Sequence, residues 1–177
     1  MITITHLGVG YVFSKTYCEL LGMHCGSEQF FTSTAMVSAI LPDIDIFFGK
    51  KINEHRNTLF HTPFFWLAVI FSLAIVGSVR KSFWPYVMAI SFGVFSHLFF
   101  DWFAGRTSGI RIFYPFSRKM HSLFPLNPQK GNVSFIPNRS NKSAYISWIR
   151  FYFNNIFLVA SEIMIFIIFL WILIFKH

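Results

Sequence analysis

Charge is scarce in this 177-residue chain. Only 12% of its residues are charged, which is about half the share found in ordinary soluble domains. Acidic groups are especially few, with seven Asp and Glu against 15 Lys and Arg and a formal net charge of +8. This composition argues against a soluble protein, and the positive excess favours anionic partners such as lipid headgroups or a phosphate-bearing substrate.

Cysteine and basic leader residues are also nearly absent. Cys18 and Cys25 are the two cysteines; on one helix they would stand two turns, about 10 Å, apart and could not form a disulfide. The opening stretch "MITITHLGVG" has no basic region before its apolar part, so we expect no cleavable signal peptide.

Apolar residues, by contrast, make up 54% of the chain and aromatic residues 20%. The runs 151–175 and 84–105 are long enough to cross a bilayer as helices, and 63–79 is at the short end of that range. Weaker apolar stretches cover 2–22 and 30–41. Continuous runs of this kind predict helices, so we expect an all-α fold: a polytopic transmembrane bundle forming a single domain over 1–177.

Local signals mark where these helices begin and end. Thr62 followed by Pro63 is typical of a helix N-terminus, and Gly105 suits a helix C-terminus. The sequence therefore predicts a helical hairpin of 63–79 and 84–104. The segment 106–150 is polar, rich in turn-forming residues and basic, which indicates a long extramembrane loop before the C-terminal transmembrane helix 151–175.

The few acids and most histidines fall at one predicted membrane face. Antiparallel helices place His61, just before the first helix of the hairpin, beside Asp101, near the end of the second. The motif "LPDID" at 41–45 precedes His61 by a short loop, and the preceding helix would then begin at the same face with His6. This face also receives eleven basic residues from 49–62 and 106–150, against Arg80, Lys81 and Lys176 opposite, so it is predicted to be cytoplasmic.

The pattern His-x-x-x-Asp at His97 and Asp101 places an imidazole and a carboxylate on one helix face. Together these groups are good ligands for zinc or another divalent metal. Ionisable groups within membrane segments are costly and usually functional. Further ligands are available in two other segments of the chain: Asp43, Asp45, His55 and His61.

The ordered motifs "TH" (5–6), "LPDIDI" (41–46), "HRNTLFHTPFF" (55–65) and "SHLFFDWF" (96–103) followed by "YPFS" (114–117) resemble the YdjM-like family of inner-membrane metal-dependent hydrolases. That family is thought to be related to the zinc-dependent phospholipase C and nuclease superfamily, whose members are all-helical and cleave phosphate esters. The resemblance implies a bacterial inner-membrane protein with one or two divalent ions, most simply zinc.

Carried onto this chain, the resemblance implies one set of metal ligands: His6, Asp43, Asp45, His61, His97 and Asp101. Asp101 could then bridge two ions. The family often reads HR-G-x-T-H-S, whereas here His55 and His61 are six apart and Asn57 replaces the glycine. His55 could therefore be a ligand or a group that supports one.

Metal-activated water would be the nucleophile of such an enzyme. The candidate catalytic groups are Asp45, His55 and Arg56, with Asp45 or Asp43 as general base. Arg106 and Arg111 are further candidates to hold phosphate oxygens. We expect membrane lipids or another anionic phosphate-bearing molecule as partner, and nucleic acid is a weaker candidate because the bilayer is a nearer source of phosphates.

Three other functions use parts of the same pattern. A zinc transporter could use the His-x-x-x-Asp pair, although transport sites lie near mid-membrane. A b-type haem protein could use His61 and His97 but has no use for the aspartates. A membrane protein without chemistry would tolerate alanine at Asp43, His97 and Asp101.

Overall fold

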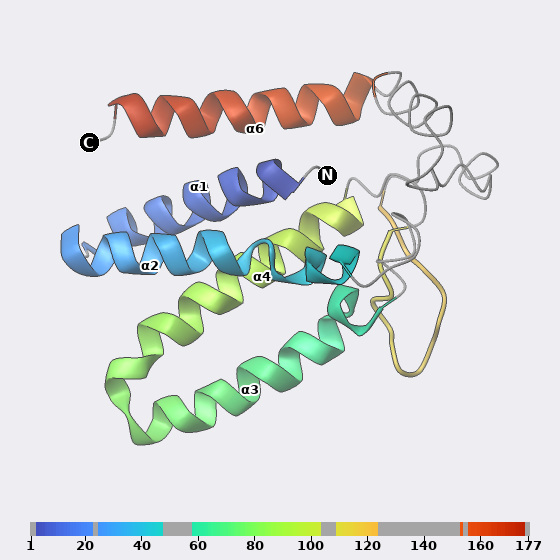
Figure 1. Cartoon of the computed structure of the whole chain (residues 1–177), viewed down its shortest axis with the longest axis horizontal. Coiled ribbons are helices and arrows are strands. Elements are labelled where there is room, and N and C mark those ends of the chain that lie inside the picture. Colours follow the sequence, from blue (N-terminus) through green and yellow to red (C-terminus); the bar gives the residue numbers. More distant parts are fainter. Residues whose placement is uncertain are drawn as a thin grey trace.

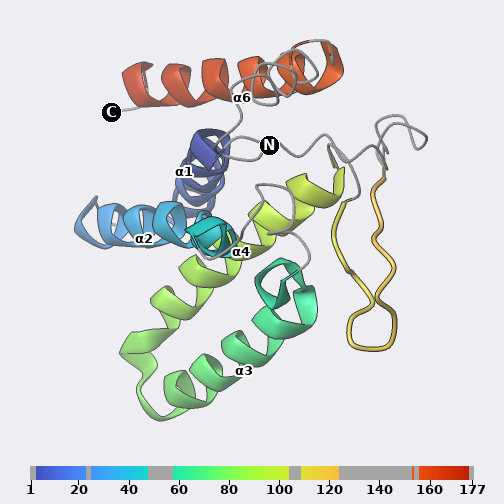
Figure 2. The same ribbon diagram turned by 45° about the vertical axis from the view of Figure 1, so that its right-hand side comes forward.

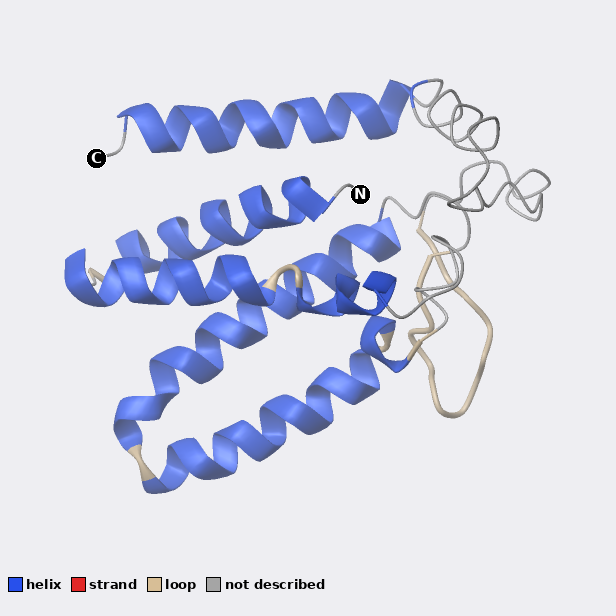
Figure 3. Ribbon diagram, in the orientation of Figure 1, coloured by secondary structure: helices blue, strands red, loops and turns tan. Residues whose placement is uncertain are grey.

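The computed structural model describes residues 3–22, 25–47, 58–103, 109–123, 153 and 156–175. Regular structure within these ranges is helical throughout (Figure 3), which confirms the predicted all-α class. The α-helices are α1 (Thr3–Leu21), α2 (Cys25–Ser38), α3 (Pro63–Val79), α4 (Trp84–Phe103) and α6 (Ile156–Phe175). Short 3-10 helices are η1 (Leu41–Phe47), η3 (Leu59–His61) and η4 (Lys81–Phe83).

The helix signals in the sequence explain the α3–α4 hairpin. Pro63 occupies the first turn of α3, and the Thr62 hydroxyl accepts a hydrogen bond from the Phe65 amide at 3.4 Å. The predicted N-terminus of α3 is thereby confirmed. The helix that follows ends at Phe103, one residue before the predicted end.

The stretch predicted as 30–41 is instead a longer helix, α2, which begins at Cys25 and gives way to η1 at Leu41. Cys18 is buried in α1. Cys18 and Cys25 belong to different helices, because a turn after Leu21 separates α1 from α2.

Helix α2 packs between α1 and α4, and small residues make this close approach possible. Ala35 of α2 and Ala39, just after its last residue, lie against Gly10 of α1 and Gly93 of α4. A Cβ atom at Gly93 would overlap the Ala35 carbonyl oxygen and stand 2.7 Å from the Ser38 Cβ. Close packing through small residues is typical of helices in membranes.

The chain direction brings several element ends together. Figures 1 and 2 show the start of α1, η1, η3, the start of α3 and the end of α4 at the same end of the molecule. Helix α6 packs against α1 on the side away from α3. The predicted meeting of distant segments at one face is thus observed as an arrangement of helix ends.

One helix in the described part of the chain, Lys81–Phe103 with η4 included, is long and apolar enough to cross a membrane. Pro63–Val79 and Val159–Phe175 are apolar but shorter. A bundle with several crossings therefore stays a prediction.

Part of the predicted basic loop is described, as residues 109–123. Ile110 and His121 pair through two backbone hydrogen bonds of 2.9 and 2.8 Å. The segment is fixed to the end of α4, because the Leu123 amide and the Ser122 hydroxyl both donate to the Trp102 carbonyl. The remainder of the loop, 106–108 and 124–150, lies outside the described residues.

The Gly93 contact gives a matched pair of stability predictions. Gly93→Ala should lower the free energy of unfolding by about 1–3 kcal/mol, because the new methyl group overlaps the α2 backbone. Gly77→Ala should raise it by up to about 1 kcal/mol through helix propensity, since a Cβ there meets Trp84 at an ordinary 3.6 Å. Denaturant unfolding of both variants in detergent measures the difference, and equal stabilities would contradict the packing described.

Candidate metal centre

Six ionisable side chains from four elements meet at the shared end of the helices. Helix α1 supplies His6, η1 supplies Asp43 and Asp45, η3 supplies His61, and α4 supplies His97 and Asp101. None of the six is more than 8% exposed, and His61 and His97 are fully buried. So many buried ionisable groups require mutual pairing or a bound ion to compensate their charge.

His97 has a ring orientation set by the backbone. Its Nδ1 lies 2.7 Å from the Ala39 carbonyl oxygen. A carbonyl can only accept a hydrogen bond, so Nδ1 carries the proton. In the neutral imidazole, Nε2 then presents a lone pair, and this atom has no hydrogen-bond partner among the described residues.

His61 is oriented in the same manner by a carboxylate. Its Nδ1 lies 3.2 Å from Asp45 Oδ2, and the Thr58 hydroxyl donates to the same oxygen. Asp45 accepts from Nδ1 and so leaves Nε2 of the neutral ring as an electron-pair donor. A ring nitrogen bound to a carbonyl or carboxylate, with the other nitrogen free to ligate, is the usual arrangement of a metal-binding histidine.

The two Nε2 atoms approach the same two carboxylates. His61 Nε2 lies 3.5 Å from Asp43 Oδ1 and 3.7 Å from Asp101 Oδ2. His97 Nε2 lies 3.6 Å from Asp43 Oδ1 and 3.5 Å from Asp101 Oδ2. These separations are longer than charge-assisted hydrogen bonds, which measure about 2.7–2.9 Å.

The same separations fit the edges of a coordination shell. Ligands 2.0–2.1 Å from a tetrahedral zinc ion stand about 3.3–3.4 Å from one another. The four nitrogen-to-oxygen separations of 3.5–3.7 Å are therefore close to the ligand-to-ligand spacing around a zinc ion. The donor set of imidazole and carboxylate is also one that zinc accepts.

His6 adjoins this set and forms, with Asp43 and His97, a group that could itself hold a metal ion. Its ring stacks on that of His97, with centroids 3.7 Å apart. Its Nε2 lies 3.5 Å from Asp101 Oδ1, the carboxylate oxygen that faces away from His61 and His97. Neither ring nitrogen of His6 has a hydrogen-bond partner among the described residues.

In the absence of an ion, the two groups in the 3-10 helices, Asp43 and His61, shift each other's pKa values. Burial alone would raise the pKa of Asp43, but the His61 hydrogen bond and the nearby His97 and His6 outweigh it, so that pKa lies below its usual range. Burial alone would lower the pKa of His61, yet its bonds to Asp43 and Asp45 and the charge of Asp101 raise it above its ordinary value. The charge of each of these groups is thus compensated by several neighbouring groups of the cluster.

The structure brings together the six residues predicted as ligands, and groups drawn from them could hold a metal ion: His6, Asp43 and His97, or His61, His97 and Asp101. Asp45 belongs to neither of these groups, and its carboxylate contacts the Nδ1 atom of His61. His55, Arg56 and Arg106 lie outside the described residues. Arg111 belongs to the 109–123 segment anchored at the end of α4.

Two contributions to the site were not predicted from the sequence. The Ala39 carbonyl orients His97, and a backbone acceptor leaves no trace in residue type. Thr58 contacts Asp45 and lies in the motif "HRNTLFHT", where a hydroxyl three residues before His61 was available as a signal.

The fold and the cluster define a class: a small all-helical protein with a buried histidine and aspartate cluster at one end that could hold a metal ion. The chain belongs to the YdjM inner membrane protein family, whose model matches residues 1–177. No curated protein and no solved structure is significantly similar to the chain. The family description places it among inner membrane proteins, as the sequence predicted.

The orienting role of Asp45 predicts the effect of its removal. Asp45→Asn should weaken metal binding by about 10–100-fold, as is typical when a group that orients a ligand is lost. Titration of the metal-free protein with Zn²⁺ measures the affinity. Glu19→Gln, which neutralises an exposed acid of α1, is the control and should bind normally. An unchanged affinity of Asp45→Asn would show that Asp45 does not position His61.

Proposed function

We propose that this protein is a metal-dependent hydrolase of the bacterial inner membrane that cleaves a phosphate ester in a lipid or another anionic, membrane-associated substrate. One observation carries the proposal: in a buried site, the Nε2 atoms of His61 and His97 each lie 3.5–3.7 Å from Asp43 Oδ1 and from Asp101 Oδ2. Zinc is the ion that the donor set and the edge lengths suit best.

The proposed roles divide between holding the ion and orienting its ligands. His61, His97, Asp43 and Asp101 would hold it, and His6 with the second oxygen of Asp101 would hold a further one. When bound, such an ion supplies a water of lowered pKa and a positive centre for a phosphoryl oxygen. Asp45 and the Ala39 carbonyl keep the two imidazoles in the ligating tautomer.

One of the acids of the cluster is proposed to accept the proton that the reaction releases. Asp45 Oδ2 is engaged by His61 and Thr58, whereas Asp45 Oδ1 has no hydrogen-bond partner among the described residues. That oxygen is the proposed acceptor of the proton released in the reaction. Arg56, Arg106 and Arg111 keep their proposed roles at the substrate phosphate, and His55 keeps its proposed role as a ligand or a group that supports one.

The place of the cluster favours hydrolysis over the alternatives. Asp101 lies two residues before the last residue of α4, whereas a transport site is expected near mid-membrane. A haem held by His61 and His97 would have to occupy the space of two carboxylates, because both Nε2 atoms lie within 3.7 Å of the Asp101 oxygen.

The proposed topology follows the charge distribution. We infer that α3, α4 and α6 cross the membrane and that the cluster faces the cytoplasm, because the segments flanking it carry most of the basic residues. Cysteine accessibility labelling at Arg118, which is exposed, and at Arg80 on the opposite side should report opposite faces.

The test is hydrolysis by purified, zinc-loaded protein in detergent. We expect release of phosphate or alcohol from phosphoester lipids, loss of that activity with a chelator, and recovery on adding zinc. His97→Ala should be inactive under all conditions. Zinc flux into vesicles without any ester hydrolysis would support the transporter instead and contradict the proposal.

A further inference from the structure

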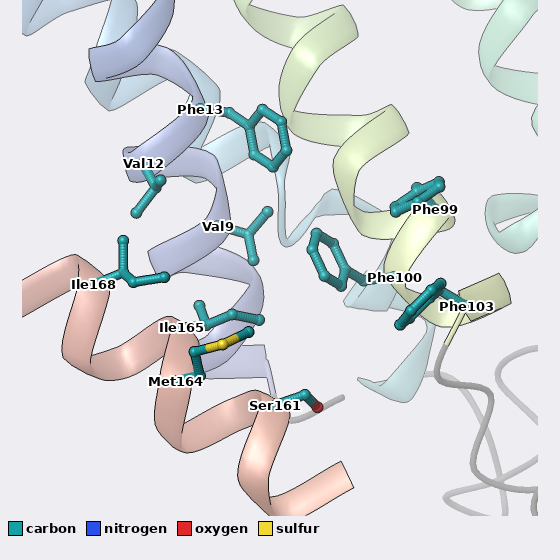
Figure 4. Close-up of a pocket in the computed structure, with 10 residues that line it drawn as sticks. All are labelled: Val9, Val12, Phe13, Phe99, Phe100, Phe103, Ser161, Met164, Ile165 and Ile168. Carbon is teal, nitrogen blue, oxygen red and sulfur yellow. The ribbon is translucent and has the colours of Figure 1, made fainter. Parts of the chain in front are cut away.

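An apolar cavity of about 380 Å³ lies between α1, α4 and α6. Figure 4 shows its lining: Val9 and Phe13 from α1, Phe100 and Phe103 from α4, and Ile165 and Ile168 from α6 face a common space. Its volume lies within the range of about 300–1,000 Å³ that is usual for ligand sites. Ser161 is the one lining residue with a polar side chain.

The cavity adjoins the metal-binding cluster. Val9 follows His6 by one helical turn on α1, and Phe100 lies between His97 and Asp101 on α4. Val9, Phe100 and Ile165 pack together as the inner wall. A ligand that reached both places would present its charge to the cluster and its hydrocarbon to the cavity.

The cavity is elongated and accessible from outside. From Ser161 to Ile168 its α6 wall extends over seven residues, about 10 Å along the helix axis. Several lining side chains are half exposed, including Phe13 at 46%, Phe99 at 48% and Met164 at 57%. A chain lying in the bilayer could enter sideways, between α4 and α6, without leaving the membrane.

We infer that this cavity binds a hydrocarbon chain of the substrate, a phosphate-bearing lipid whose headgroup lies at the metal centre. The inference rests on the proposed function and adds to it the substrate class and a second binding region. The charge arrangement supports this occupant, because on both α1 and α4 a residue of the proposed cation site lies within one helical turn of a residue that lines the apolar cavity. Each methylene buried there should change affinity by about fourfold.

Photolabelling tests the occupant directly. The full-length, zinc-loaded protein in phosphatidylcholine vesicles receives phosphatidic acid with a diazirine in mid-chain, and labelled peptides are quantified. We expect labelling of α1, α4 and α6 at the cavity to exceed labelling of α3 at least fivefold. Met164→Trp should abolish that excess. Leu67→Trp on α3, where Leu67 is 56% exposed, is the matched control and should preserve it.

Two outcomes of the labelling experiment would contradict the inference. Equal labelling of α3 and the cavity would mean contact with bulk lipid only. Equal cavity labelling by a diacylglycerol probe without phosphate would show a groove unconnected with the metal centre. Either result overturns the inference. If no ester is hydrolysed by the wild type, the proposed function fails while the labelling still decides the cavity.

A kinetic measurement separates the chain site from the chemistry. The ratio of hydrolysis of a long-chain lipid phosphoester to that of a short water-soluble one should fall about tenfold in Met164→Trp and stay constant in Leu67→Trp. An unchanged ratio in Met164→Trp would contradict the chain-binding role even in an active enzyme.

Discussion

Replacing His97 or Asp101 by alanine is expected to lower affinity for Zn²⁺ by more than about 100-fold. Each substitution removes a donor atom that lies within 3.7 Å of two others in the cluster. Loss of a group that merely orients a ligand already weakens binding by about 10–100-fold, so loss of a ligand should exceed that range. Metal content after dialysis, measured by elemental analysis, reports the change.

The control for this prediction is His121→Ala. His121 pairs with Ile110 through the backbone in the 109–123 segment and belongs to neither group of possible ligands. It should retain wild-type metal content, and circular dichroism should show all variants to be helical. Equal metal content in wild type, His97→Ala and Asp101→Ala would remove the proposed centre.

Metal removal is expected to destabilise the protein strongly. Without an ion, the charges of the buried carboxylates are compensated only by the neighbouring imidazoles and hydrogen bonds. Zinc at 1,000 times its dissociation constant should stabilise the fold by about 4 kcal/mol. For a chain of this length, that corresponds to a rise in melting temperature of about 8–16 °C.

Intrinsic tryptophan fluorescence during heating, with zinc or with a chelator, measures this shift in detergent. The same comparison in Asp101→Ala is the control and should show a shift of no more than a few degrees. If wild type and variant respond equally to zinc, the stabilising ion is bound elsewhere.

The helical class and the meeting of the polar residues were predictable because each depends on local patterns. Continuous apolar runs predict helices, and Thr62 with Pro63 marks the start of α3. Alternating helix directions then place His6, His61 and Asp101 at one end without any knowledge of packing.

The inner arrangement of the site was not predictable, because it depends on contacts between distant segments. The sequence treats Asp43 and Asp45 alike, two residues apart in "LPDID". The 3-10 helix η1 turns Asp43 toward both Nε2 atoms and Asp45 toward the far nitrogen of His61. The contact of His97 with Ala39 depends on the close approach of α2 and α4 at Gly93.

The apolar cavity could not be predicted from the sequence either. Its walls come from three helices, and their separation depends on how α6 lies on α1 (Figure 2). Exposed Phe13, Phe99 and Met164 are indistinguishable in sequence from side chains that face bulk lipid.

X-ray absorption spectroscopy of the zinc-loaded protein tests the central claim most directly. The account predicts a first shell of nitrogen and oxygen atoms alone, at about 2.0–2.2 Å, with the outer scattering of at least two imidazoles. Both imidazoles should be lost together with bound zinc in the His61→Ala, His97→Ala double variant. Sulfur scattering at about 2.3 Å, or zinc without imidazole, would contradict the centre described.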